Sequence, residues 1–110
     1  MVTIYHNLDP GVSARMADPA FRERYGPEPS GLELAGVVAG TDDLDAAFDH
    51  TIHRDGENWT DYAGVIFFGD RRGRRSSQEG DVFVRGDGSA FLVLSLGFRP
   101  LPDLRLPFLP

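Results

Sequence analysis

Runs of β-branched and aromatic residues recur along the chain, separated by short polar segments rich in glycine, proline and aspartate. Such runs predict short strands over residues 2–6, 32–40, 65–68, 81–85 and 90–95. The last two runs flank the segment Gly-Asp-Gly-Ser, and an Asp-Gly step between apolar runs favours a tight hairpin with both central turn residues at positive φ. The pattern therefore predicts four or five strands, with a hairpin near the C-terminal end.

Two segments carry helical signals instead. Over residues 41–53, apolar or small side chains recur at the spacing of a helix that packs one face on a core: Leu44, Ala47, Phe48, Thr51 and Ile52. Thr41 is the expected N-cap of this helix. Asp18 and Pro19 indicate the start of a second, shorter helix, which Gly26 would end.

Together these elements predict one α+β domain over residues 1–100, with a mostly antiparallel sheet of four to five short strands and the 41–53 helix packed on one face. A sheet covered once leaves a second face and an edge that need protection. Residues 101–110 form a tail rich in proline and leucine. Its apolar side chains predict that residues 101–109 are ordered against their own domain or against a neighbouring subunit: Leu101, Leu104, Leu106, Phe108 and Leu109.

Charge and composition narrow the classes of function. The formal net charge is −6, and all 11 basic residues are arginine. An acidic chain lacks a general attraction to phosphate backbones, which disfavours nucleic acid unless a local basic patch overrides the mean. The absence of cysteine excludes disulfides, thiolate catalysis and sulfur-ligated zinc. With no secretory signal at its start and no apolar run of membrane-spanning length, we expect a cytoplasmic protein without a membrane partner.

The charged segment 69–80 predicts a surface loop. Its four arginines are candidate partner-binding residues, because each guanidinium can grip a carboxylate or a phosphate with two hydrogen bonds: Arg71, Arg72, Arg74 and Arg75. The alternative is a solvated loop that offsets the surplus of carboxylates. The acidic face of the 41–53 helix, which carries Asp42, Asp43 and Asp49, is a second candidate surface.

Aromatic residues between the helix and the hairpin are candidates for an exposed anchor, because binding energy concentrates in such side chains: Trp59, Tyr62, Phe67 and Phe68. Aromatic residues beside a core helix more often belong to the core. We assign Phe67 to the core and keep Trp59 as a candidate partner-binding residue.

His50 and His53 are spaced so that they can share a metal ion, with His6 as a candidate third ligand. The alternative is a pair of solvated histidines near a helix C-terminus, where the helix dipole favours them. Asp81 and Asp87 occupy hairpin positions where aspartate is expected for backbone reasons, and no catalytic motif is present. We therefore predict no cofactor, no metal and no catalytic residue.

Residues 44–61 and 74–101 resemble the YodL-like family of small proteins from bacteria and their plasmids and phages. The resemblance covers roughly residues 32–101, and Gln78 stands where the pattern has its second serine. It implies a small accessory protein of mobile-element type, in some cases a regulator that binds another protein. The positions that carry it are Phe48, Thr51, Trp59, Thr60, Arg75, Ser76, Gly80, Asp81, Val82, Asp87, Gly88, Gly97, Phe98 and Leu101.

These observations lead to one preferred function and two alternatives. The preferred function is a non-catalytic, protein-binding regulator or accessory protein, present as a monomer or a homodimer. The first alternative is a nucleic-acid-binding accessory protein that acts through the Arg71–Arg75 loop. The second is a metal-dependent enzyme that uses His50 and His53.

Overall fold

The computed structural model describes residues 1–69 and 74–106, and these form one α+β domain. The strands in the described residues are β1 (Val2–Asn7), β2 (Leu32–Val38), β3 (Val65–Phe67), β4 (Val82–Arg85), β5 (Ala90–Leu94) and β6 (Gly97–Pro100). The helices are α1 (Val12–Arg15), α2 (Pro19–Arg24) and α3 (Leu44–Asp49), with 3₁₀ turns at Pro29–Gly31 and Trp59–Asp61.

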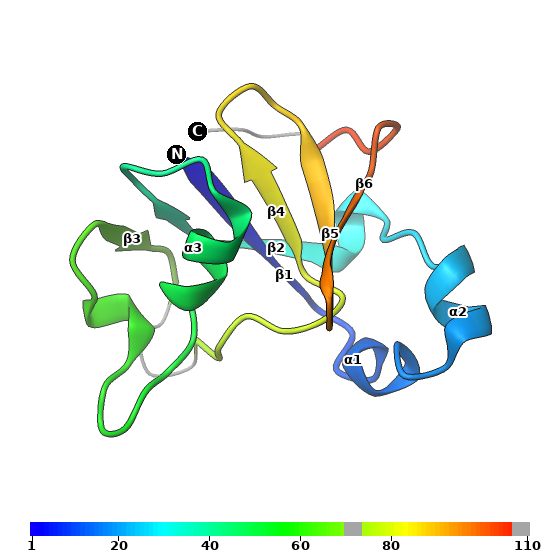
Figure 1. Ribbon diagram of the computed structural model, residues 1–110, viewed down its shortest axis with the longest axis horizontal. Coiled ribbons are helices and arrows are strands. Elements are labelled where there is room, and N and C mark those ends of the chain that lie inside the picture. Colours follow the sequence, from blue (N-terminus) through cyan, green and yellow to red (C-terminus); the bar gives the residue numbers. More distant parts are fainter. Residues whose placement is uncertain (70–73, 107–110) are drawn as a thin grey trace.

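The six described strands form a single antiparallel sheet in the order β3-β2-β1-β4-β5-β6 (Figure 1). The antiparallel sheet is as predicted, but it has one strand more than the four or five expected. The additional strand is β6, which pairs with β5 from Leu94↔Gly97 to Phe91↔Pro100. No strand was predicted over residues 97–100, because proline disfavours pairing inside a sheet, yet proline is tolerated at the end of an edge strand.

Each face of the sheet carries a buried apolar cluster, and side chains alternate between the two clusters along the central strands. Ile4, Phe83 and Val93 belong to a cluster that α3 covers, whereas their neighbours along the strands belong to a second cluster on the opposite face, packed against Val12 and Met16. Figure 1 shows α3 in front of the sheet, with α1 and α2 beyond the end of β1, on the opposite side of the molecule from β3.

The tail covers part of this second face. Leu101, Leu104 and Leu106 pack against its apolar cluster, and the backbone N–H of Leu101 donates to the carbonyl of Ala90 at 2.9 Å. For these three leucines the predicted ordering against the chain's own domain is confirmed. Phe108 and Leu109 lie outside the described residues.

Local differences from the sequence prediction have identifiable causes. The helix predicted over residues 41–53 spans only Leu44–Asp49. At its N-terminus Asp43 rather than Thr41 is the cap, with the Asp43 side chain accepting from the Asp45 N–H at 3.0 Å. In the β4–β5 hairpin, Gly88 has a φ of 90°, whereas Asp87 does not adopt positive φ. The Gly88 N–H donates to the Arg85 carbonyl at 2.9 Å. The connection is therefore a longer turn with one left-handed glycine, not the two-residue turn that was predicted.

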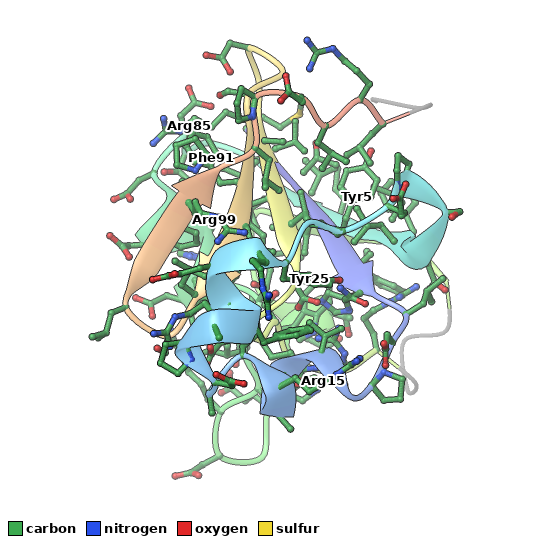
Figure 2. The ribbon with its side chains drawn as sticks, turned by 90° about the vertical axis from the view of Figure 1, so that its right-hand side faces the viewer. Tyr5, Arg15, Tyr25, Arg85, Phe91 and Arg99 are labelled. Carbon is green, nitrogen blue, oxygen red and sulfur yellow. The ribbon has the colours of Figure 1, made fainter. Side chains whose placement is uncertain are left out.

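Helix α2 begins as predicted, with the Asp18 side chain accepting from the Ala20 N–H at 3.0 Å and Pro19 in its first turn. The C-terminal end of α2 is hydrogen-bonded to β6. The guanidinium of Arg99, a β6 residue, donates to the carbonyls of Arg22, at 2.6 Å, and Tyr25 (Figure 2). A cation at a helix C-terminus satisfies free carbonyls and complements the helix dipole. No helix within residues 1–69 and 74–106 is long and apolar enough to cross a membrane.

Candidate functional site

Arg74 and Arg75, predicted to lie in a surface loop and to be available to a partner, form ion pairs with carboxylates of the same chain. Arg75 forms a two-pronged ion pair with Asp81, with Nη2–Oδ1 and Nη1–Oδ2 distances of 2.6 and 2.8 Å. Arg74 Nη1 donates to Glu33 Oε1 at 2.6 Å, and its Nη2 donates to the Phe68 carbonyl. Pairing with a carboxylate allows the Arg74 side chain to be only 10% exposed, whereas that of Arg75 remains 33% exposed. Arg71 and Arg72 lie outside the described residues.

Asp81 is the fully buried centre of this arrangement. Its carboxylate accepts from the backbone N–H groups of Asn7 and Gln78, each at 2.8 Å, in addition to both Arg75 bonds. Burial raises the pKa of Asp81, while Arg75 and the two N–H groups act in the opposite direction. The residue joins the end of β1 to the start of β4. Sequence reasoning assigned it only a turn role, because a Gly-Asp step before a strand does not reveal a partner six residues away.

Trp59, the other candidate partner-binding residue, is fully buried in the cluster under α3. Its indole Nε1 donates to the Arg75 carbonyl at 2.8 Å, and its backbone N–H donates to His53 Nδ1 at 3.2 Å. In this structure Trp59 therefore stabilises the core and the 75–76 backbone, and presents no surface to a partner.

Of the three acidic residues on the predicted helix face, two make structural contacts and one is exposed to solvent. Asp42 pairs with the N-terminal ammonium of Met1 at 2.8 Å, Asp43 caps α3, and Asp49 is exposed. Neither histidine of the candidate metal pair joins a metal-binding cluster: over the part of the chain that the structure describes, no three His, Asp or Glu side chains are placed to hold an ion. His50 Nδ1 lies 2.8 Å from the Ala46 carbonyl.

Three consecutive large apolar residues are exposed at the edge of the sheet. We call Ile66, Phe67 and Phe68 the β3 surface; their exposed fractions are 57%, 36% and 37%. The assignment of Phe67 to the core is wrong, because β3 is an edge strand and the residue opposite Phe67 on β2 is Gly36, which has no side chain to cover it. Sequence alone indicated a strand here but not its position in the sheet.

No protein family, curated protein or solved structure matched the chain when it was compared with each. The resemblance to the YodL-like family therefore remains a prediction from the residue pattern. The candidate functions depend on the geometry of the chain itself.

Proposed function

We propose that this protein is a non-catalytic, protein-binding regulator or accessory protein, and that it binds an extended segment of its partner along the free edge of β3. The observation that carries the proposal is the β3 surface: three consecutive large apolar residues lie exposed at the end of β3 and directly after it, and the outer edge of β3 pairs with no strand in the described part of the chain. Exposed apolar clusters and open sheet edges are typical of protein interaction sites.

The outer edge of β3 offers backbone hydrogen-bonding groups as well as apolar side chains. Two hydrogen bonds join the ends of this segment to β2 and its flanking residue: Ala39 N–H donates to the Gly64 carbonyl at 2.8 Å, and Phe68 N–H donates to the Ala35 carbonyl at 2.9 Å. The backbone N–H and carbonyl groups of the even-numbered residues of this segment therefore point toward β2. Because the pattern alternates in an antiparallel pair, the N–H and carbonyl of Phe67 point away from the sheet. An added strand would bond to both groups while contacting Phe67 on one face and Ile66 and Phe68 on the other.

The dimensions and charge of this edge favour a segment of another protein over a second copy of the chain. β3 has three residues, about 10 Å of strand, between Gly64 and Gly69, which both adopt positive φ. Pairing two copies through so short an edge would bury far less than the roughly 1,200 Å² of a stable interface. Two copies would also repel, since each carries a formal net charge of −6. The same charge favours a basic segment as the partner.

Nucleic-acid binding through the arginine loop has less support. Arg75 pairs with the buried Asp81, and Arg74 is 10% exposed and pairs with Glu33, so the two do not form the exposed row of positive charges that a phosphate backbone needs. The regulators of the YodL-like family, which the sequence resembles, are consistent with a protein partner.

Photo-crosslinking tests the proposal. We expect a photoreactive phenylalanine analogue in place of Phe67 to crosslink one partner protein in extracts of the source cells. The crosslinked segment of that partner should be basic and extended. The same analogue at Leu96, a 95% exposed leucine in the β5–β6 turn, is the control and should not capture that peptide.

The captured peptide, once synthesised, should bind the unmodified protein and slow amide exchange at Phe67. Phe67→Lys should weaken binding at least about tenfold, whereas Leu96→Lys, with the same charge change, should not. Three results would contradict the proposal. The two substitutions could weaken peptide binding equally, position 67 could crosslink to a second copy of the chain, or the protein could bind DNA or RNA in a salt-sensitive way and not the peptide.

A further inference from the structure

A polar pocket separate from the β3 surface lies where β1 ends, β2 begins and the 74–78 segment crosses them. It has a volume of about 520 Å³, within the usual range for small-molecule sites. Its polar lining residues are His6, Asn7, Glu33, Arg74, Arg75 and Gln78. We call it the His6 pocket.

Two nearly buried side chains of the His6 pocket carry polar atoms without a partner. They are Nε of Arg74 and Nε2 of His6. His6 Nε2 lies 4.0 Å from Asp81 Oδ2, beyond hydrogen-bond distance. Buried polar groups in proteins are almost always hydrogen-bonded, and each exception requires an explanation. Both atoms belong to groups that can donate to an oxyanion.

The charges around the pocket favour an anion. Burial, Arg75 and Arg74 together lower the pKa of His6 to about 3, against the opposite effect of Glu33. Arg75 is committed to the buried carboxylate of Asp81. The carboxylate that pairs with Arg74 is much more exposed than Asp81. The Glu33 side chain is 48% exposed, although the Arg74 side chain itself is only 10% exposed.

An ion pair with one half-exposed member is weak and exchangeable, because water competes for the exposed carboxylate. Another oxyanion can therefore replace Glu33 on Arg74 at little cost. We propose that the His6 pocket binds the carboxylate or phosphate group of a small ligand, which displaces Glu33 and accepts hydrogen bonds from Arg74. This inference does not depend on the proposed function: Arg74 touches the β3 surface only through the backbone carbonyl of Phe68, and no residue of that surface lines the pocket.

Titration of the isotope-labelled protein with inorganic phosphate, and separately with acetate, tests the inference by NMR. We expect saturable shifts at the Arg74 Nε–H and the His6 ring with at least one of the two anions. Saturation with phosphate alone identifies a phosphate ligand, and saturation with acetate alone identifies a carboxylate ligand.

Glu33→Gln should raise the affinity roughly two- to fivefold, because it removes the competing carboxylate. Such a gain cannot arise from damage to the fold. Asp9→Asn is the matched control: it removes the carboxylate of the exposed Arg15–Asp9 pair, at 2.5 Å, and changes the net charge equally. Shifts that do not saturate with either anion, or equal gains in both variants, would overturn the inference.

Discussion

His6 is 4% exposed and lies among charged groups from three parts of the chain. Asp81 approaches it from the start of β4, Arg74 and Arg75 from the preceding segment, and Glu33 from β2. The imidazole is kept neutral because burial, followed by Arg75 and Arg74, lowers its pKa to about 3. In the unfolded chain a histidine titrates near 6.5. At a pH between these two pKa values, the histidine is protonated in the unfolded chain but neutral in the folded protein.

Stability should therefore fall as pH decreases from about 6.5 toward 3, by roughly 1.4 kcal/mol for each pH unit. The unfolding free energy of the unmodified protein relative to His6→Gln should decrease by about 2 kcal/mol between pH 7 and pH 5. Urea unfolding at the two pH values measures this change. His50→Gln, at an exposed position, controls for loss of a histidine. If the difference in unfolding free energy between the unmodified protein and His6→Gln is the same at both pH values, the prediction is contradicted.

Gly36 is required by the close approach of β2 to its neighbours. A Cβ atom at this position would lie 2.6 Å from the Ile66 carbonyl oxygen and 3.3 Å from two atoms of the Trp59 ring. A backbone oxygen cannot rotate away, so Gly36→Ala should reduce the unfolding free energy by about 1–3 kcal/mol and shift the emission of Trp59. Denaturant unfolding measures the first effect and fluorescence the second.

Gly26→Ala is the control for Gly36→Ala, because nothing lies within 4 Å of its added Cβ and its φ is not positive. It should be neutral or slightly stabilising, since alanine reduces the entropy of the unfolded chain. Equal stability of the two variants would show that β3 moves aside freely.

Among the elements, the tail can be removed without interrupting the sheet, yet its removal exposes apolar surface. Leu101, Leu104 and Leu106 cover the cluster on the face opposite α3. Deletion of residues 102–110 should lower the unfolding free energy by about 2 kcal/mol and the melting temperature by roughly 10 °C. Thermal unfolding and light scattering measure the loss of stability and any aggregation. Asp103→Ala, at an exposed turn position, should change neither; a truncated protein as stable as the full chain would contradict the role of the tail.

The strands were predictable where the chain carries apolar runs, and α3 was predictable from its periodicity. β6 was missed because its four residues end in proline, and β6 is a strand only through its pairing with β5. α1 was missed because four residues are too few to show a helical period. Short elements take their conformation from the surface on which they pack, and that surface is assembled from distant parts of the chain.

At the scale of the whole molecule, apolar runs in the strands and one amphipathic helix were sufficient to determine an antiparallel α+β domain, since alternation and helical spacing are properties of neighbouring residues. Only the tertiary structure decided which residues are buried or exposed. Arg74 is withdrawn from water by Glu33, 41 residues away, and Phe67 is exposed because β3 was left at the edge. Burial of a charge requires a partner, and exposure of an apolar side chain requires a missing neighbour; both depend on contacts between residues far apart in the sequence.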